Sequence, residues 1–169
     1  MPKDLLRQLA LEIISCIPKD AVQVYIAGSR TEGRTGSGIF IETPHFKATI
    51  KQRNPDTCSV LKSQLIAINV GLDAILAYDC DFGELWILSD SRNALQRLGG
   101  WSSACDETSI SILLKLRKIS QIHDVHLKWI PSHVNISGNE VADRLAKEDS
   151  ENEMVTGSSL IYQELYWVA

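Results

Sequence analysis

The order of the predicted elements identifies an α/β fold built on a mixed sheet. Three β-favouring stretches joined by short links lie between residues 21 and 51, which predicts an antiparallel meander. Residues 84–88 form a later apolar strand with a helical pattern on each side, and residues 125–129 form another, so these two strands should pair in parallel through crossovers. We therefore expect a mixed five-stranded sheet, three strands antiparallel and two parallel, flanked by helices.

The composition is that of an ordinary folded domain. The chain has 169 residues, of which 44% are hydrophobic and 22% charged, which is enough for one core and too apolar for a disordered chain. The net charge of −4 and the pI of about 5.5 argue against a general nucleic-acid binder, which is usually basic. A local basic patch is still compatible with these values.

The cysteines and the N-terminus indicate the compartment. Cys16, Cys58, Cys80 and Cys105 are widely separated and lack metal-finger spacing, so free thiols in a reducing intracellular compartment, cytoplasm or nucleus, are the simplest interpretation. The N-terminus lacks the apolar core of a signal peptide, and we expect no apolar run long enough to span a membrane.

The first part of the chain alternates between helical and strand patterns. Residues 4–16 place leucine and isoleucine at helical spacing, which predicts a packing helix or the remainder of an upstream domain. Residues 21–27 follow as a buried strand, and the glycine-rich residues 28–38 should be a turn before the strands at 39–41 and 46–51. A phosphate loop is a weak alternative for the glycines, since no G-K-[ST] follows and the next element is a strand.

The later part of the chain contains three predicted helices and a C-terminal tail whose structure the sequence does not determine. Apolar residues at helical intervals predict helices over residues 60–78, 91–98 and 106–120. The tail is first acidic and then aromatic, so it either packs back on the domain or forms a mobile end. The expected division is an N-terminal helical extension, the α/β domain and a C-terminal tail (residues 1–20, 21–150 and 151–169).

Residues 129–143 combine a strand end, a histidine loop and a helix with a carboxylate. Pro131 ends the last strand because proline has no N–H to donate to a β-ladder. His133 lies in the loop that follows. Ser137 and Glu140 fit a capping box, in which a serine precedes a glutamate by three residues, and Asp143 lies in the first turns of the helix. This order could bring a carboxylate and an imidazole to the edge of the sheet.

Asp90 is a second candidate because it directly follows an apolar strand, and ligands of such sheets lie near the carboxyl ends of strands. The alternative is that Asp90 caps the helix that begins at residue 91, since aspartate is a good N-cap. Taken alone, Asp143 could be a solvated helix carboxylate and His133 a surface histidine.

Four segments in order resemble the motifs of the type 1 ribonuclease H family, most closely the domains of retroelement polyproteins. The resemblance extends from about Val22 to about Lys147 and includes the strand and helix positions (motifs at residues 25–29, 63–68, 88–91 and 138–143). It implies the ribonuclease H fold and hydrolysis of the RNA strand of an RNA–DNA hybrid. In the family, four carboxylates hold two Mg²⁺ ions, with Mn²⁺ a possible substitute, and a mobile histidine assists.

The chain departs from the family pattern at two of the four carboxylates. Ala27 stands at the first position, where an alanine has no donor atom, and Gln64 stands at the second, where only an uncharged amide oxygen is present. Asp90, Asp143 and His133 match the remaining positions, so Asp90 and Asp143 are the expected metal ligands. With two of four charges missing, we expect weakened binding of Mg²⁺ and an inactive or impaired enzyme.

The surface for nucleic acid is a separate expectation. Backbone, hydroxyl and basic groups suited to phosphates and 2′-hydroxyls occur near the motifs (Gly28, Ser29, Arg30, Asn54 and Ser91). The alternatives to an impaired enzyme are a non-catalytic module that binds hybrids and a folded remnant without function. We expect a monomer with no membrane contact, originally part of a larger reverse-transcriptase polyprotein.

Overall fold

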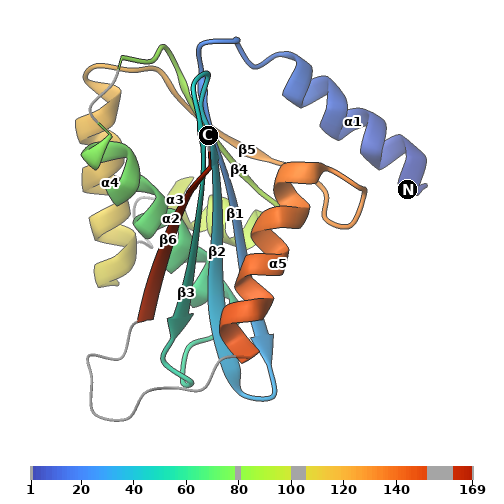
Figure 1. Cartoon of the computed structure of the whole chain (residues 1–169), viewed down its shortest axis with the longest axis vertical. Helices are drawn as coiled ribbons and strands as arrows, with labels where there is room; N and C mark the ends of the chain where they lie inside the picture. The colour runs from blue at the N-terminus through green and yellow to red at the C-terminus, as the bar shows by residue number, and fades with distance from the viewer. Residues whose placement is uncertain (1, 79–80, 100–105, 152–161, 169) are drawn as a thin grey trace.

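The chain forms one mixed sheet with helices on both faces. The computed structural model describes residues 2–78, 81–99, 106–151 and 162–168 (Figure 1). The strand order is β5-β4-β1-β2-β3-β6. Helices α2, α3 and α4 lie on one face, and α1 and α5 lie on the other (Figure 1).

Five of these strands are those that the sequence predicts. β1 (Val22–Thr31), β2 (Arg34–Glu42) and β3 (Lys47–Asn54) form the antiparallel meander. β4 (Leu85–Ser89) pairs in parallel with β1, and β5 (Val125–Trp129) pairs in parallel with β4. The predicted mixed five-stranded sheet is therefore confirmed.

The expected long turn over residues 28–38 is wrong. Nearly all of these residues belong to β1 and β2, which pair without interruption from Gln23 with Glu42 to Thr31 with Arg34. The turn consists of Glu32 and Gly33 alone, with φ angles of 52° and 78°, as in a type I′ hairpin. Gly28 and Gly38 lie within the strands, at places where a helix packs closely on the sheet.

A sixth strand extends the sheet at the β3 edge. β6 (Tyr162–Val168) pairs antiparallel with β3 from Lys47–Val168 to Arg53–Tyr162. Of the two alternatives for the tail, packing back on the domain is therefore the one seen for these residues. The predicted domain boundaries themselves stay a prediction.

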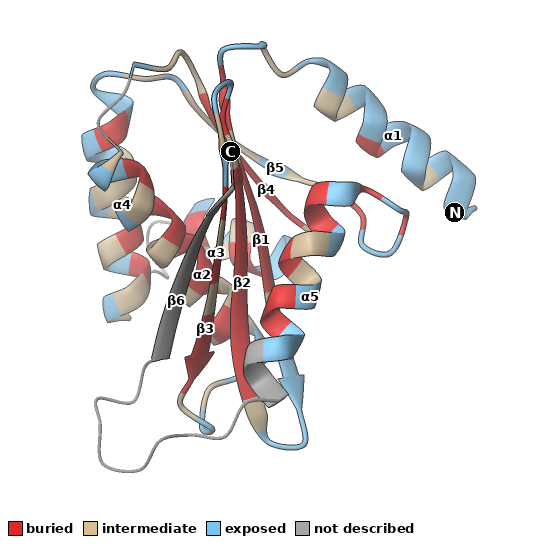
Figure 2. Ribbon diagram, viewed as in Figure 1, coloured by how far each residue is buried: buried red, intermediate tan, exposed pale blue. Residues whose placement is uncertain are grey.

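Two apolar clusters hold the helices on the sheet. α2 (Val60–Ala77) and α4 (Glu107–Ser120) pack on the first, with Ile26, Ile39 and Ile87 from the central strands. The second cluster lies on the opposite face and includes Tyr25 and Leu88 (Figure 2). The helices on this opposite face are α1 (Lys3–Ser15) and α5 (Ser137–Glu151). The short helix α3 (Arg92–Gly99) follows β4 and lies on the face of α2 and α4.

Helix α2 corrects one expectation about membranes. By length and composition its 18 residues could cross a bilayer, although we expected no such stretch. In the fold, seven of its residues are buried and it packs against β1 and β2. A helix in the core of a sheet protein is apolar on most of its surface, and this explains why it resembles a membrane span.

Candidate functional site

The site begins where β1 and β4 run side by side. Ile26 of β1 is in register with Ser89 of β4, so Ala27 lies level with Asp90. Ala27 is 2% exposed and contributes a methyl group to the second apolar cluster. The position at which the family motif has its first carboxylate is therefore filled here by a side chain that packs in the core.

Gln64 of α2 lies close to β1, at the residue that follows Ala27, because Gly28 has no side chain to keep the helix away. A Cβ on Gly28 would lie 2.8 Å from the backbone nitrogen of Gln64, closer than real Cβ contacts. Glycine thus lets the first turns of α2 approach β1. The backbone arrangement that would present a carboxylate from residue 64 is present, and the side chain is an uncharged amide.

Asp90 does not cap the helix that follows it. The Ser91 hydroxyl accepts a hydrogen bond from the Ala94 N–H at 3.1 Å and so occupies the N-cap position of α3. The Asp90 carbonyl accepts a bond from Trp129 Nε1 at 3.1 Å, and Ile130 N–H donates to the Ser89 carbonyl. These bonds fix the Asp90 backbone and leave its carboxylate available for a site.

The carboxylate of Asp90 lies within electrostatic reach of Asp143. Burial raises the pKa of Asp90, and the negative charge of Asp143 raises it further. The nearby His133 and a backbone hydrogen bond of Asp90 itself act in the opposite direction. The structure therefore brings together three of the residues that the sequence singles out.

Helix α5 carries Asp143 and sits very close to β2. A Cβ on Gly38 would overlap the Ala142 carbonyl oxygen and would lie 2.6 Å from the Ala146 nitrogen.

The predicted capping box is wrong by one residue: Ser137 is already helical, and Glu140 N–H donates to the Ile136 carbonyl. The buried Ile136 side chain fixes this start.

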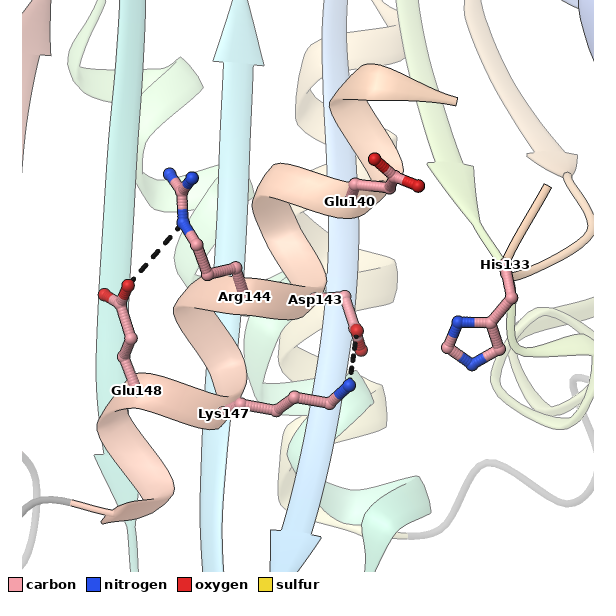
Figure 3. A pocket seen from close by; sticks show the side chains of 6 residues that line it. All are labelled: His133, Glu140, Asp143, Arg144, Lys147 and Glu148. Carbon is pink, nitrogen blue, oxygen red and sulfur yellow. Dashed lines mark ion pairs between the residues drawn. The ribbon is translucent and has the colours of Figure 1, made fainter. Parts of the chain in front are cut away.

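A basic residue that the sequence analysis overlooked contacts Asp143. Lys147 Nζ lies 2.8 Å from Asp143 Oδ2, one helical turn further along α5. Figure 3 shows Glu140, Asp143 and Lys147 on the side of α5 that faces His133, and the Arg144–Glu148 pair on the other side. The i, i+4 spacing of Asp143 and Lys147 could have indicated this ion pair.

His133 lies opposite α5 across an open pocket of about 470 Å³. Its side chain is exposed and its φ is 57°, a left-handed conformation that histidine adopts more readily than most residues. Asn135 has a φ of 61°, so the loop contains two such residues. The imidazole therefore lines the same pocket as Asp143.

The candidate contacts to nucleic acid are placed differently from one another. Arg30 is exposed at the end of β1, next to Ser29 and Gly28. Asn54 is fully buried and donates to Ser37 Oγ at 2.8 Å, and the Ser91 hydroxyl is the cap of α3. Gly28 therefore lies against Gln64, Ser29 is buried at 8% exposure, and the Asn54 and Ser91 side chains are used internally.

The residues present do not fit a pair of divalent ions. Within the described residues, no three side chains of histidine, cysteine, aspartate or glutamate are arranged to hold a metal. Asp90 and Asp143 are two carboxylates where the family uses four, and Asp143 already has an ammonium partner in Lys147. Mg²⁺ prefers several anionic oxygens and octahedral geometry, which this set does not supply.

Comparison with known proteins gives a consistent result. The model of the RNase H family matches residues 19–151. No curated protein matches the chain. Among solved structures, the chain is similar to LC9-RNase H1, described as a type 1 RNase H with the type 2 active-site motif, at 19% identity and a TM-score of 0.60 over 79% of this chain and 74% of the other. It is also similar to RNase H1 from the halophilic archaeon Halobacterium salinarum NRC-1, at 19% identity and a TM-score of 0.54 over 76% and 96%.

Proposed function

The chain belongs to the ribonuclease H family, as a type 1 domain, and from this premise we propose that it engages RNA–DNA hybrids with its cleavage activity lost or strongly reduced. The family is one of hydrolases that act on such hybrids. The observation that carries the proposal is the pair of uncharged residues at the place where α2 packs on β1. Ala27 is packed into an apolar cluster and Gln64 is uncharged, and Gly28 lets α2 pack closely on β1 at this point.

The electrostatics support loss of cleavage more strongly than loss of binding. Two Mg²⁺ ions would bring four positive charges to a site with two carboxylates, one of which already pairs with Lys147. The reaction depends on metal ions to activate the nucleophile and stabilise the leaving oxygen. The backbone phosphates of a hybrid, by contrast, meet less negative charge here than they would at four carboxylates.

A purely binding module is the second candidate, and the basic residues favour it. Arg30 is exposed on the β1–β2 hairpin beside Gly28 and Ser29. Helix α4 also carries the basic residues Lys115, Arg117 and Lys118, although Lys115 pairs with Asp73 at 2.7 Å. If phosphate contacts dominate, the affinity for hybrid should fall steeply with salt. A remnant without function should show neither cleavage nor such binding.

Three further proposals concern the context of the chain. We propose a monomer, a reducing intracellular location in cytoplasm or nucleus, and an origin within a larger reverse-transcriptase polyprotein. Light scattering at several concentrations would test the first proposal. A concentration-dependent rise in mass would contradict it.

The decisive experiment compares the chain with a variant that restores both carboxylates. A labelled RNA–DNA hybrid is incubated with the chain and with the Ala27→Asp, Gln64→Glu double variant, first in Mg²⁺ and then in Mn²⁺. We expect cleavage by the double variant alone, together with salt-sensitive binding of the hybrid by both proteins in EDTA. The control is Ala27→Ser with Gln64→Asn, which changes the same positions without adding charge.

The other outcomes also decide between the candidates. Cleavage by the unmodified chain would contradict the proposed loss of activity and would mean that Asp90 and Asp143 hold enough metal. If neither protein cuts and both bind hybrid over duplex DNA, the binding module is supported. If neither cuts nor binds, the remnant is supported.

A further inference from the structure

Helix α1 lies outside the family match, which begins at residue 19, yet it packs into the domain. Ala10 is fully buried, and Leu6, Ile13 and Ile14 are partly buried against the second apolar cluster. Figure 1 shows α1 beside the loop that joins β5 to α5, and Figure 2 shows that the opposite side of the helix is exposed. The helix is therefore part of the domain surface next to the candidate site.

The loop beside α1 is the one that carries His133, and it is held by its apolar residues. Ser132, His133 and Asn135 are exposed, whereas Val134 is 2% and Ile136 is 4% exposed. Val134 and Ile136 belong to the same contiguous cluster as Ala10. His133 and Asn135 are left-handed without being glycine, and buried neighbours such as Val134 and Ile136 help to hold that conformation.

We propose that α1 is a brace that holds the loop of His133 in place, with Ala10 as the main positioning residue. The inference rests on the proposed function only for its consequence, since a brace is useful if His133 contacts a bound hybrid. Ala10 does not touch the ligand and acts through the apolar cluster that it shares with Val134 and Ile136. Removing the packing should leave the sheet folded and let the loop open locally, because loops with few buried contacts are the first parts to open.

The test disturbs the packing in the full chain and measures the loop directly. Ala10→Gln places a larger polar side chain in the buried position, and Leu9→Gln is the matched control at an exposed position of the same helix. We expect amide hydrogen exchange of residues 132–136 to rise about tenfold in Ala10→Gln, with exchange in β1 and β4 unchanged. Leu9→Gln should match the unmodified chain.

The affinity for hybrid then shows whether the brace acts through His133. We expect Ala10→Gln to weaken binding about fivefold in the unmodified chain and by less than about twofold in a His133→Ala background, because coupled residues are not additive. Equal weakening in both backgrounds, or an unchanged loop exchange despite faster exchange in α1, would overturn the proposal. An absence of effect of His133→Ala on affinity would overturn its functional part.

A second variant and the exchange measurement separate failure of the brace from general unfolding and from failure of the proposed function. If Ala10→Gln speeds exchange throughout the sheet, the milder Leu6→Gln carries the same predictions with smaller changes. If the unmodified chain binds no hybrid, the proposed function fails, while the exchange of residues 132–136 still decides whether α1 braces the loop.

Discussion

The two halves of the candidate site share a backbone design and differ in chemistry. In the β4–α5 half, Asp90 and Asp143 keep their carboxylates, and Gly38 lets α5 approach the sheet. In the β1–α2 half, Gly28 likewise lets α2 approach β1, but Ala27 and Gln64 carry no charge. The comparison shows that the packing of the fold and the chemistry of the site are separable, because the packing depends on glycines and apolar residues that the substitutions leave in place.

The largest expected effect comes from filling the two glycine contacts. Gly38→Ala should lower the free energy of unfolding by about 3 kcal/mol or more, since its Cβ meets the α5 backbone, which cannot rotate away. Gly28→Ala should lower it by about 1–3 kcal/mol, partly relieved by movement of the Ser63 and Gln64 side chains. Urea unfolding measures both, with Gly99→Ala, where a Cβ meets nothing within 4 Å, as the control. Equal stability of Gly28→Ala and the control would mean that the β1–α2 half has lost its packing as well.

The next largest change in the free energy of unfolding is expected when a carboxylate is placed at position 27 in the absence of a metal ion. Ala27→Asp should lower the free energy of unfolding by about 1–3 kcal/mol at pH 7, because it buries a carboxylate near Asp90. Burial would raise the pKa of the new aspartate above its unfolded value near 4. The loss should therefore be smallest at low pH, where only the packing and burial of the neutral carboxyl contribute, and should grow as the pH rises from the unfolded pKa toward the raised folded pKa. Unfolding curves between pH 3 and 7 test this, and a loss that shrinks toward pH 7 would contradict it.

Much of the fold could be predicted from the sequence because periodicity reports which side of an element is buried. The strands β1 to β5 and the helix α2 follow from it directly. The glycine stretch was misread because glycine signals turns and close helix contacts equally, and only the partner helices decide between them. Sequence spacing also could not tell that Ser91, and not Asp90, caps α3.

For the candidate site, the roles of the residues stay a prediction. Asp90 lies close enough to Asp143 and His133 for both to affect its pKa. Lys147 was overlooked although its i, i+4 spacing was visible. The burial of Asn54 could not be foreseen, because it depends on Ser37 from a neighbouring strand.

A smaller effect is expected from neutralising Asp90. Burial and the charge of Asp143 raise the pKa of Asp90 in the folded state. This group thus favours folding at low pH, and the contribution is lost as the pH rises from about 4, the unfolded value. Asp90→Asn should raise the free energy of unfolding by about 0.5 kcal/mol at pH 7 and by nothing at pH 3. Urea unfolding at both pH values tests it, with the exposed Asp124→Asn as control, and a loss of stability at pH 7 would show that Asp90 is held by favourable contacts.

The smallest effect concerns the ion pair on α5. Lys147 is 53% exposed and Asp143 25%, so the pair should contribute about 0.3–0.5 kcal/mol, as exposed i, i+4 pairs do. A double-mutant cycle with Lys147→Met and Asp143→Asn would measure it, and raising the salt concentration should reduce it further. The Arg144–Glu148 pair on the other side of the helix provides a matched cycle. A coupling energy well above 1 kcal/mol would show that Lys147 is a structural part of the site.

The loss of the metal site is tested most directly by a Mg²⁺ titration followed by ¹H–¹⁵N NMR, comparing the unmodified chain with the Ala27→Asp, Gln64→Glu double variant. We expect saturable shifts at the amides of residues 90, 91 and 143 in the double variant. The unmodified chain should show only weak, unsaturated shifts at about 10 mM Mg²⁺, because hard cations need several anionic oxygens. Saturation of the unmodified chain below about 1 mM would contradict the central claim that the two lost carboxylates have removed the metal site.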